Sequence, residues 1–328
     1  MKKSLIALAV LATTGVAMAQ SSVTLYGRID TSIGSTKLNG VSTSQVYSGN
    51  LTTSRYGFRG TEDLGGGLKA NFVLENGFNA DDGTLGSANT AFNRQAWVGL
   101  SGGFGALKLG KTDSVYKDIY DLGNAHNVFD SEFTATKEAY RAGLGGFTSR
   151  PNNQIRYETP NMGGFSAGLT YALDEDVAAN AETTALNLRY SAGNLAVGVA
   201  YQEDDFQVLA NDRKYTVLAG TYNFGVAKVS GQLQNIKAGD NRKDTEFALG
   251  VSVPVGNVDL SAGYARSKAK DAAGADAQKG TAFSLGATYG LSKRTKLYGG
   301  YIDGEVETAA GVSVRDYRLF ALGVRHDF

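Results

Sequence analysis

The sequence predicts an all-β fold: a closed antiparallel barrel of about sixteen strands that crosses a membrane. Runs in which apolar and polar residues alternate fill most of the chain, and helical periodicity is almost absent. Short and long connections alternate strictly between these runs. The chain also ends within such a run, where one strand face carries Phe320, Leu322, Val324, His326 and Phe328 and the other carries Leu319, Ala321, Gly323, Arg325 and Asp327.

The N-terminal stretch MKKSLIALAVLATTGVAMAQ has the pattern of a secretory signal peptide. Two lysines precede an apolar run from Leu5 to about Val16, and small residues follow at Ala17 and Ala19. We expect cleavage after Ala19, which leaves a signal peptide over residues 1–19 and a barrel domain over residues 20–328. A membrane anchor is the alternative, but the apolar run is too short to span a bilayer.

The composition suits β structure in an exported protein. The chain has 43 glycines, 3 prolines and no cysteine, so tight turns are abundant, strands are rarely interrupted and no disulfide supplies rigidity. Removing Lys2 and Lys3 with the signal peptide lowers Lys plus Arg from 32 to 30, against 32 Asp plus Glu, which argues against nucleic-acid binding. The mean hydropathy of −0.21 fits a soluble protein or a membrane barrel with a polar lumen.

Individual strands follow from runs such as SVTLYGRID, SAGLTYAL, LAVGVAYQ, VDLSAGYA and AFSLGATYG. Tight turns are expected at 62–67, 101–105, 161–164, 191–194, 223–226, 254–257 and 290–293. Longer polar loops are expected near 38–52, 79–91, 113–152, 173–183, 203–213, 237–244, 267–280 and 303–312. In an up-and-down sheet the two kinds of connection lie at opposite ends, which is typical of an outer-membrane barrel.

Closure of the barrel explains the aromatic last residue. The final strand must pair with the first, which removes sheet edges that would otherwise promote aggregation. Phe328 is then expected at the membrane–water boundary, facing outward in an aromatic girdle with residues such as Tyr26 or Tyr301. An edge strand on a soluble core is the alternative, and it would not account for the alternating connections.

Several blocks of sequence resemble the general porins of the Gram-negative outer membrane, and the β-proteobacterial branch most closely. They are SSVTLYGRIDTSI, TSRYGFRGTEDLGGGLKANFVLENGF, RQAWVGLSGGFGALKLGK and the terminal LGVRHDF, and the resemblance runs from Ser21 to Phe328. It implies sixteen strands, a homotrimer in outer-membrane lipid, and a third external loop folded into the lumen. It also implies that Phe328 is part of the signal read by the barrel assembly machinery. Small residues at Gly27 and Gly99, assigned to the outer face, are a physical hint of close barrel–barrel contact.

A barrel of about sixteen strands leaves an aqueous channel, so we expect passive diffusion of small hydrophilic solutes and ions. The longest connection, about residues 113–152, is the candidate for narrowing that channel. Its aromatic residues favour packing against the barrel wall, and a mobile external loop is the alternative. The acidic residues assigned to this pore loop are Asp113, Asp118, Asp121, Asp130 and Glu132.

A basic wall is expected to face the pore loop. Strand parity assigns inward positions to Arg28, Arg55, Arg59, Arg94 and Arg156, the assignment of Arg94 depending on an outward Trp97. The resemblance supports Arg28, Arg55 and Arg94 as the basic cluster of a constriction, with Arg150 as a further candidate. Arg59 and Arg156 could equally be paired with neighbouring carboxylates. Permanent arginine charge in a narrow pore predicts a weak anion preference, which the loop acids could cancel or reverse.

Two other functions remain open on the sequence. A substrate-specific channel would need a binding track such as an aromatic ladder, but most tyrosines share parity with outward residues. A barrel enzyme would need a nucleophile–base or His–Asp arrangement, but the only histidines are His126 in the long loop and His326 on the outward face. No Cys/His cluster or EF-hand spacing is present, so no catalytic, metal or cofactor site is assigned. The exposed loops also leave room for a secondary adhesin role.

Overall fold

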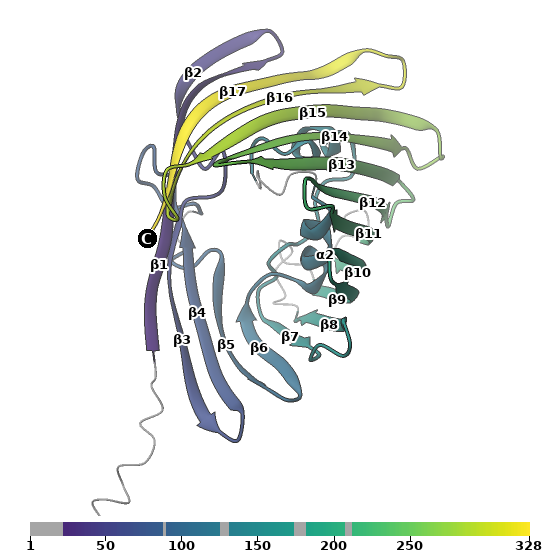
Figure 1. Cartoon of the computed structure of the whole chain (residues 1–328). Helices are drawn as coiled ribbons and strands as arrows, with labels where there is room; N and C mark the ends of the chain where they lie inside the picture. The colour runs from purple at the N-terminus through teal and green to yellow at the C-terminus, as the bar shows by residue number, and fades with distance from the viewer. Residues whose placement is uncertain (1–21, 88–89, 125–130, 174–181, 207–211) are drawn as a thin grey trace, which may run out of the picture.

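A computed structural model describes residues 22–87, 90–124, 131–173, 182–206 and 212–328 of the chain. Its strands form one antiparallel sheet that curls round until the first strand meets the last (Figure 1). The predicted closed antiparallel barrel is therefore confirmed. The expected signal peptide, residues 1–19, lies outside the described residues.

Strands account for most of the described chain. They are β1 (Ser22–Leu38), β2 (Val41–Ser48), β3 (Arg55–Gly65), β4 (Leu68–Gly77), β5 (Gln95–Gly102), β6 (Gly105–Lys111), β7 (Gln154–Glu158), β8 (Phe165–Ala172), β9 (Glu182–Ala192), β10 (Leu195–Asp205), β11 (Arg213–Asn223), β12 (Lys228–Ala238), β13 (Lys243–Val255), β14 (Val258–Lys270), β15 (Asp276–Gly290), β16 (Thr295–Thr308) and β17 (Ser313–Asp327). Short helices are α2 (Val115–Gly123), α3 (Ala135–Ala139) and η1 (Tyr140–Ala142). Within the described ranges, no helix combines the length and apolarity needed to cross a membrane.

The seventeen strands occupy sixteen positions around the barrel. One side of β1 pairs with β17 from Arg28 to Leu38. The other side is shared, because β2 pairs with β1 from Thr31 to Leu38 and β3 pairs with it from Ser22 to Arg28. Strands β2 and β3 are therefore two parts of one barrel strand, interrupted at residues 49–54, and the predicted strand number is confirmed.

The two ends of the barrel carry different connections, as expected. Two residues each join β3 to β4, β5 to β6, β9 to β10 and β13 to β14. At the other end, parts of the expected loops are strand: β1 runs to Leu38, β14 to Lys270 and β16 to Thr308. The β1–β2 turn uses Asn39 and Gly40, whose φ angles are +48° and +87°. Polar residues occur on both faces of such strand ends, as Thr36 and Lys37 do in β1, so the alternation that reveals a strand in the sequence is weakened although backbone pairing continues.

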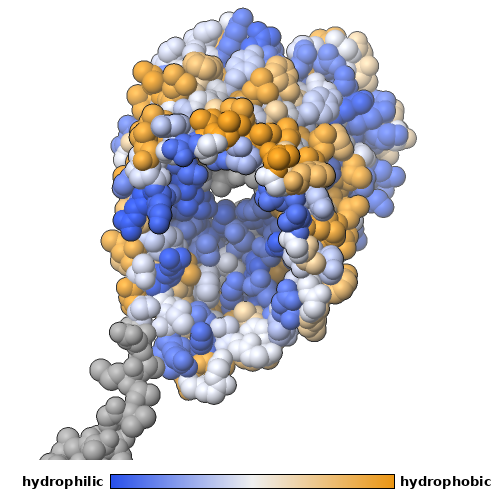
Figure 2. Space-filling view, viewed as in Figure 1, coloured by the Kyte–Doolittle hydropathy of each residue, from blue (hydrophilic) through white to orange (hydrophobic). Residues whose placement is uncertain are grey.

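Side chains alternate between the outer surface and the lumen. Leu25, Ile29, Tyr56 and Phe58 are exposed on the outside, as predicted. Figure 2 shows hydrophobic residues gathered on the outer face and hydrophilic residues around the opening. The girdle position assigned to Tyr26 is wrong: this ring shares the lumen parity of Arg28, and its hydroxyl donates a hydrogen bond to the carboxylate of Glu75 at 3.1 Å.

The C-terminus closes the barrel against the first strand. The backbone N–H of Gly27 donates to the carbonyl of Phe328 at 3.1 Å, and the Phe328 N–H donates to the carbonyl of Gly27 at 2.9 Å. The Phe328 ring faces outward, 42% exposed, and a Cβ at Gly27 would lie 2.4 Å from it. Gly27 is thus covered by its own chain, and Gly99 pairs with Lys108 on the lumen face. The outward assignment of Gly99 is therefore wrong, whereas Gly27 lies on the outer face and is covered by the Phe328 ring.

Candidate pore constriction

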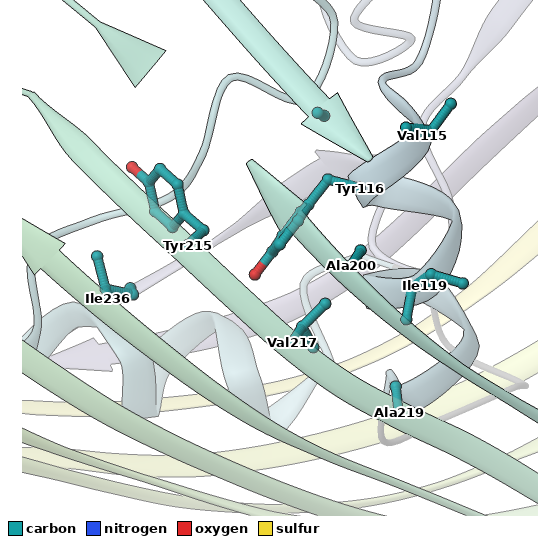
Figure 3. Close-up of a cluster of buried hydrophobic side chains, with 9 residues drawn as sticks. Val115, Tyr116, Ile119, Ala200, Tyr215, Val217, Ala219 and Ile236 are labelled. Carbon is teal, nitrogen blue, oxygen red and sulfur yellow. The ribbon is translucent and has the colours of Figure 1, made fainter. Parts of the chain in front are cut away.

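The described parts of the connection between β6 and β7, residues 112–124 and 131–153, lie inside the barrel (Figure 1). Ser114 caps α2 by accepting a hydrogen bond from a backbone N–H of the first turn. Val115, Tyr116 and Ile119 are fully buried and fall on one side of the helix. They pack against lumen-facing side chains of β9 to β12, namely Ala185, Ala200, Tyr215, Val217, Ala219 and Ile236 (Figure 3). The expectation that the pore loop packs against the wall is confirmed.

Hydrogen bonds and a glycine on the barrel wall allow α2 to pack closely against that wall. The Tyr116 hydroxyl donates to the side-chain oxygen of Gln234 at 2.6 Å. The side-chain amide of Asn187 donates to the Val115 carbonyl at 2.7 Å. A Cβ at Gly198, on β10, would lie 2.5 Å from the Cδ1 atom of Ile119. The helix therefore occupies a groove that a larger residue at position 198 would fill.

The second half of the loop packs on a surface of small residues contributed by β13 to β16. Ala135 and Ala139 of α3 contact Ala248, Ala265 and Ala282. A Cβ at Gly280 would lie 1.9 Å from the Ala139 carbonyl oxygen, so the backbone of the loop touches the backbone of the wall. The second half of the loop is thereby attached to the wall through α3.

Three of the predicted basic residues lie together on β1 and β3. Arg28 and Arg55 are cross-strand partners, and both guanidinium groups donate to the Thr52 hydroxyl, at 3.4 and 3.1 Å. The Arg59 guanidinium lies 5.0 Å from the centre of the Tyr26 ring. In the order of the sheet, β11, which α2 contacts most, is about half-way round the barrel from β3. The arginine group (Arg28, Arg55 and Arg59) therefore faces α2 across the lumen, whereas Phe133, in the second half of the pore loop, packs against Leu51, next to Thr52.

Arg94 reaches the lumen, but not for the reason that parity suggested. Its Nε atom forms an ion pair with the Glu75 carboxylate at 2.7 Å, beside Tyr26. The outward assignment of Trp97 is wrong, because Val98 is the exposed residue and the Lys108 ammonium lies 5.2 Å from the Trp97 ring centre on the lumen side. Arg94 precedes β5, so it turns inward where the alternation of that strand no longer applies.

Arg150 and Arg156 form ion pairs at the base of the pore loop and do not belong to the arginine group. The Arg150 Nε atom lies 2.7 Å from the Asp113 carboxylate. Arg156 contacts Asp118 at 2.6 Å and Glu158 at 2.9 Å, and its side chain is only 5% exposed. It also donates to the Asp113 carbonyl at 2.6 Å. Both arginines therefore neutralise loop acids and hold the loop in place.

Each assigned acidic loop residue that the structure describes has a cationic partner. Asp113 and Asp118 pair with the two arginines at the loop base, Asp121 pairs with Lys117, and Glu132 pairs with Lys137. Burial raises the pKa of Asp118 to about 6, and the charge of Arg156 opposes that shift. Asp130 and His126 lie outside the described residues.

Further cationic residues, which were not assigned from the sequence, line the lumen. Arg325 of β17 faces inward and binds Asp327 at 2.7 Å, and Asp327 also contacts Arg28 at 3.2 Å. The alternation in the terminal strand could have identified Arg325 as a lumen residue. Lys117, Lys137 and Arg141 border a cavity of about 610 Å³ beside the loop. Strand alternation could not identify Lys117, Lys137 and Arg141, because they lie on the pore loop.

Comparisons with known proteins agree with this architecture. A family described as Gram-negative porin matches residues 4–309. The chain is 40% identical to outer membrane porin protein 32 of Delftia acidovorans, over 99% of this chain and 95% of that protein. It is 32% identical to the major outer membrane protein P.IB of Neisseria meningitidis, over 96% and 99% of the two chains. The structure of the anion-selective porin from Comamonas acidovorans superposes with a TM-score of 0.78 and 33% identity, covering 94% of this chain and 100% of that one. The trimer form of OmpT from Vibrio cholerae has a TM-score of 0.74 and 20% identity, covering 94% and 99%.

Proposed function

The chain belongs to the Gram-negative porin family, and from its lumen we propose that it is a general diffusion pore of the outer membrane with a weak preference for anions. Small hydrophilic solutes and ions would pass between the arginine group and the pore loop. Neither a catalytic step nor a cofactor enters this function. The relative from Comamonas acidovorans, whose name describes it as anion-selective, supports the sign of the preference.

The arrangement of lumen charge carries the proposal. Arg28, Arg55 and Arg59 concentrate cationic charge on one wall, and Asp327, which also binds Arg325, offsets part of the charge of Arg28. The described acids of the pore loop are each paired with a nearby cation. The field in the open space is therefore dominated by the arginine group, and low-dielectric walls concentrate it on passing ions.

Reversal potentials measured in planar bilayers under a salt gradient test the proposal. Even at the dielectric constant of bulk water, a charge about 4 Å away is worth about 1 kcal/mol, or about fivefold, so the double variant Arg28→Gln/Arg55→Gln should lower the anion-over-cation permeability ratio by at least about fivefold. Arg318→Gln is the matched control, because Arg318 shares the outward parity of Phe320 and pairs with Asp303 at 2.8 Å. A wild-type potential of cationic sign, or one that the double variant leaves unchanged, would contradict the assignment.

Assembly and export belong to the same proposal. We infer a homotrimer, supported by the trimer form among the structural relatives. Residues 1–19 would act as the signal peptide, residues 20–328 as the barrel, and residues 113–152 as the pore loop. Phe328 would be recognised by the barrel assembly machinery, and its outward position is compatible with that role.

A further inference from the structure

A row of lysines crosses the outer surface of the barrel near the end with long connections. Lys237 on β12 is the direct cross-strand partner of Lys243 on β13, and Lys243 is the partner of Lys270 on β14. All three are exposed and share the outward parity of exposed apolar residues on their own strands: Leu233, Phe247 and Tyr264. The three strands are neighbours in the sheet (Figure 1).

This lysine row is poorly neutralised. Like charges directly opposite each other on neighbouring strands destabilise a sheet. The adjacent outward lysines have carboxylate partners: Lys214 binds Glu203 at 2.9 Å, Lys268 binds Asp276 at 2.7 Å, and Lys279 approaches Glu307 at 3.6 Å. Among the described residues, Lys237, Lys243 and Lys270 form no ion pair, although Asp276, which binds Lys268, is the cross-strand partner of Lys270 and interacts with it electrostatically. An external anion would supply the missing charge.

The depth of the row selects the kind of anion. The exposed apolar residues Leu233, Leu249 and Leu285 lie on the same outer face, nearer to the tight-turn end of these strands, and mark the hydrocarbon level of the membrane. Lys237 is four residues beyond Leu233, roughly 13 Å along the strand, which reaches the polar headgroups. Long external loops place that end of the barrel at the outer leaflet. Anions fixed at this depth are the headgroups of outer-leaflet lipids.

We propose that Lys237, Lys243 and Lys270 form a binding site for the phosphate groups of an outer-leaflet lipid. The row spans two interstrand spacings, roughly 10 Å, so it suits a headgroup with more than one phosphate. The lysine stems extend from the apolar band toward the polar boundary, and their ammonium groups reach the phosphates while the acyl chains cover Leu233 and Phe247. The site lies on the outside of the barrel and does not depend on conduction through the lumen.

Binding of a bisphosphorylated, multiply acylated glucosamine disaccharide lipid to the folded, detergent-solubilised protein tests the site. Lys237→Gln/Lys243→Gln/Lys270→Gln should weaken this binding by roughly tenfold or more, since each basic residue near an anionic surface contributes separately. The matched control is Lys214→Gln/Lys268→Gln/Lys279→Gln, which removes the same charge from paired lysines on the same face and should change affinity by less than about threefold. Heat-modifiable migration on gels verifies that both variants are folded.

Three results would overturn the proposal. Equal weakening in the two triple variants would indicate a general effect of surface charge. Unchanged binding in the lysine-row variant would show that the lipid binds elsewhere. If inorganic phosphate displaces the lipid at a concentration similar to that at which the lipid itself binds, the lysine row is a site for free anions and not for a lipid. The binding measurement remains interpretable whether or not bilayer recordings support the proposed pore.

Discussion

The contact between Ile119 and Gly198 predicts how firmly the pore loop is held. Ile119 is fully buried, and a Cβ at Gly198 would lie 2.5 Å from its Cδ1 atom. Ile119→Ala removes three buried carbon atoms and should weaken docking of the loop by about 2–4 kcal/mol. Gly198→Ala places a methyl group in occupied space and should cost about 1–3 kcal/mol. Because each change relieves the defect of the other, the double variant should cost at least about 1 kcal/mol less than the sum.

Limited trypsin digestion of the folded protein measures this docking, since Lys117, Lys137 and Arg141 lie on the loop. The cleavage rate should rise at least tenfold in each single variant and fall again in the double variant. Leu186→Ala is the matched control, because Leu186 on β9 is 51% exposed on the outer face of the same wall. Single-channel recordings should show more current fluctuation in the variants that are cleaved faster. Additive effects in the double variant, or a fast-cleaved control, would refute this account of loop packing.

Two further predictions concern pH and assembly. Burial raises the pKa of Asp118 from 3.8 to about 6, so the folded protein holds this proton more tightly, and the contribution of Asp118 to the free energy of unfolding rises as the pH falls from about 6 to 3.8. Protonation of Asp118 also removes a negative charge beside Arg156, so the anion preference measured from reversal potentials should increase as the pH falls through about 6. If the Asp118→Asn variant shows the same increase, Asp118 is not its cause. Phe328→Ala uncovers Gly27 and should lower the yield of folded protein in the outer membrane severalfold, whereas the outward Phe320→Ala should not; equal yields would remove the special role of the last residue.

Strand parity was reliable where a strand lies in the lipid region. Leu25, Ile29, Tyr56 and Phe58 face outward as the alternation predicts, because lipid and water impose opposite preferences on the two faces. The same reasoning failed for Trp97, since an aromatic residue is not restricted to the lipid face and here stacks with a lumen lysine.

Residue type and position also identified the pore loop, but not the partners of its charges. The length and aromatic content of residues 113–152 indicated a packed segment, as the structure confirms. Arg150 and Arg156 were assigned to the wall opposite the loop, although they bind Asp113 and Asp118 at its base. No local pattern distinguishes a lumen arginine that faces open space from one that anchors a loop.

The sequence by itself determined the closed β-barrel, the separation of tight turns from long loops and the outward terminal Phe328, because these depend on local alternation and connection length. Tertiary structure decided that β2 and β3 share one barrel position, that Arg28 and Arg55 meet at Thr52, and that three lysines form a row across β12 to β14. Each of these depends on the register between strands, which is set by contacts between residues far apart in the chain. A shift by one residue would turn the same side chains to the opposite face.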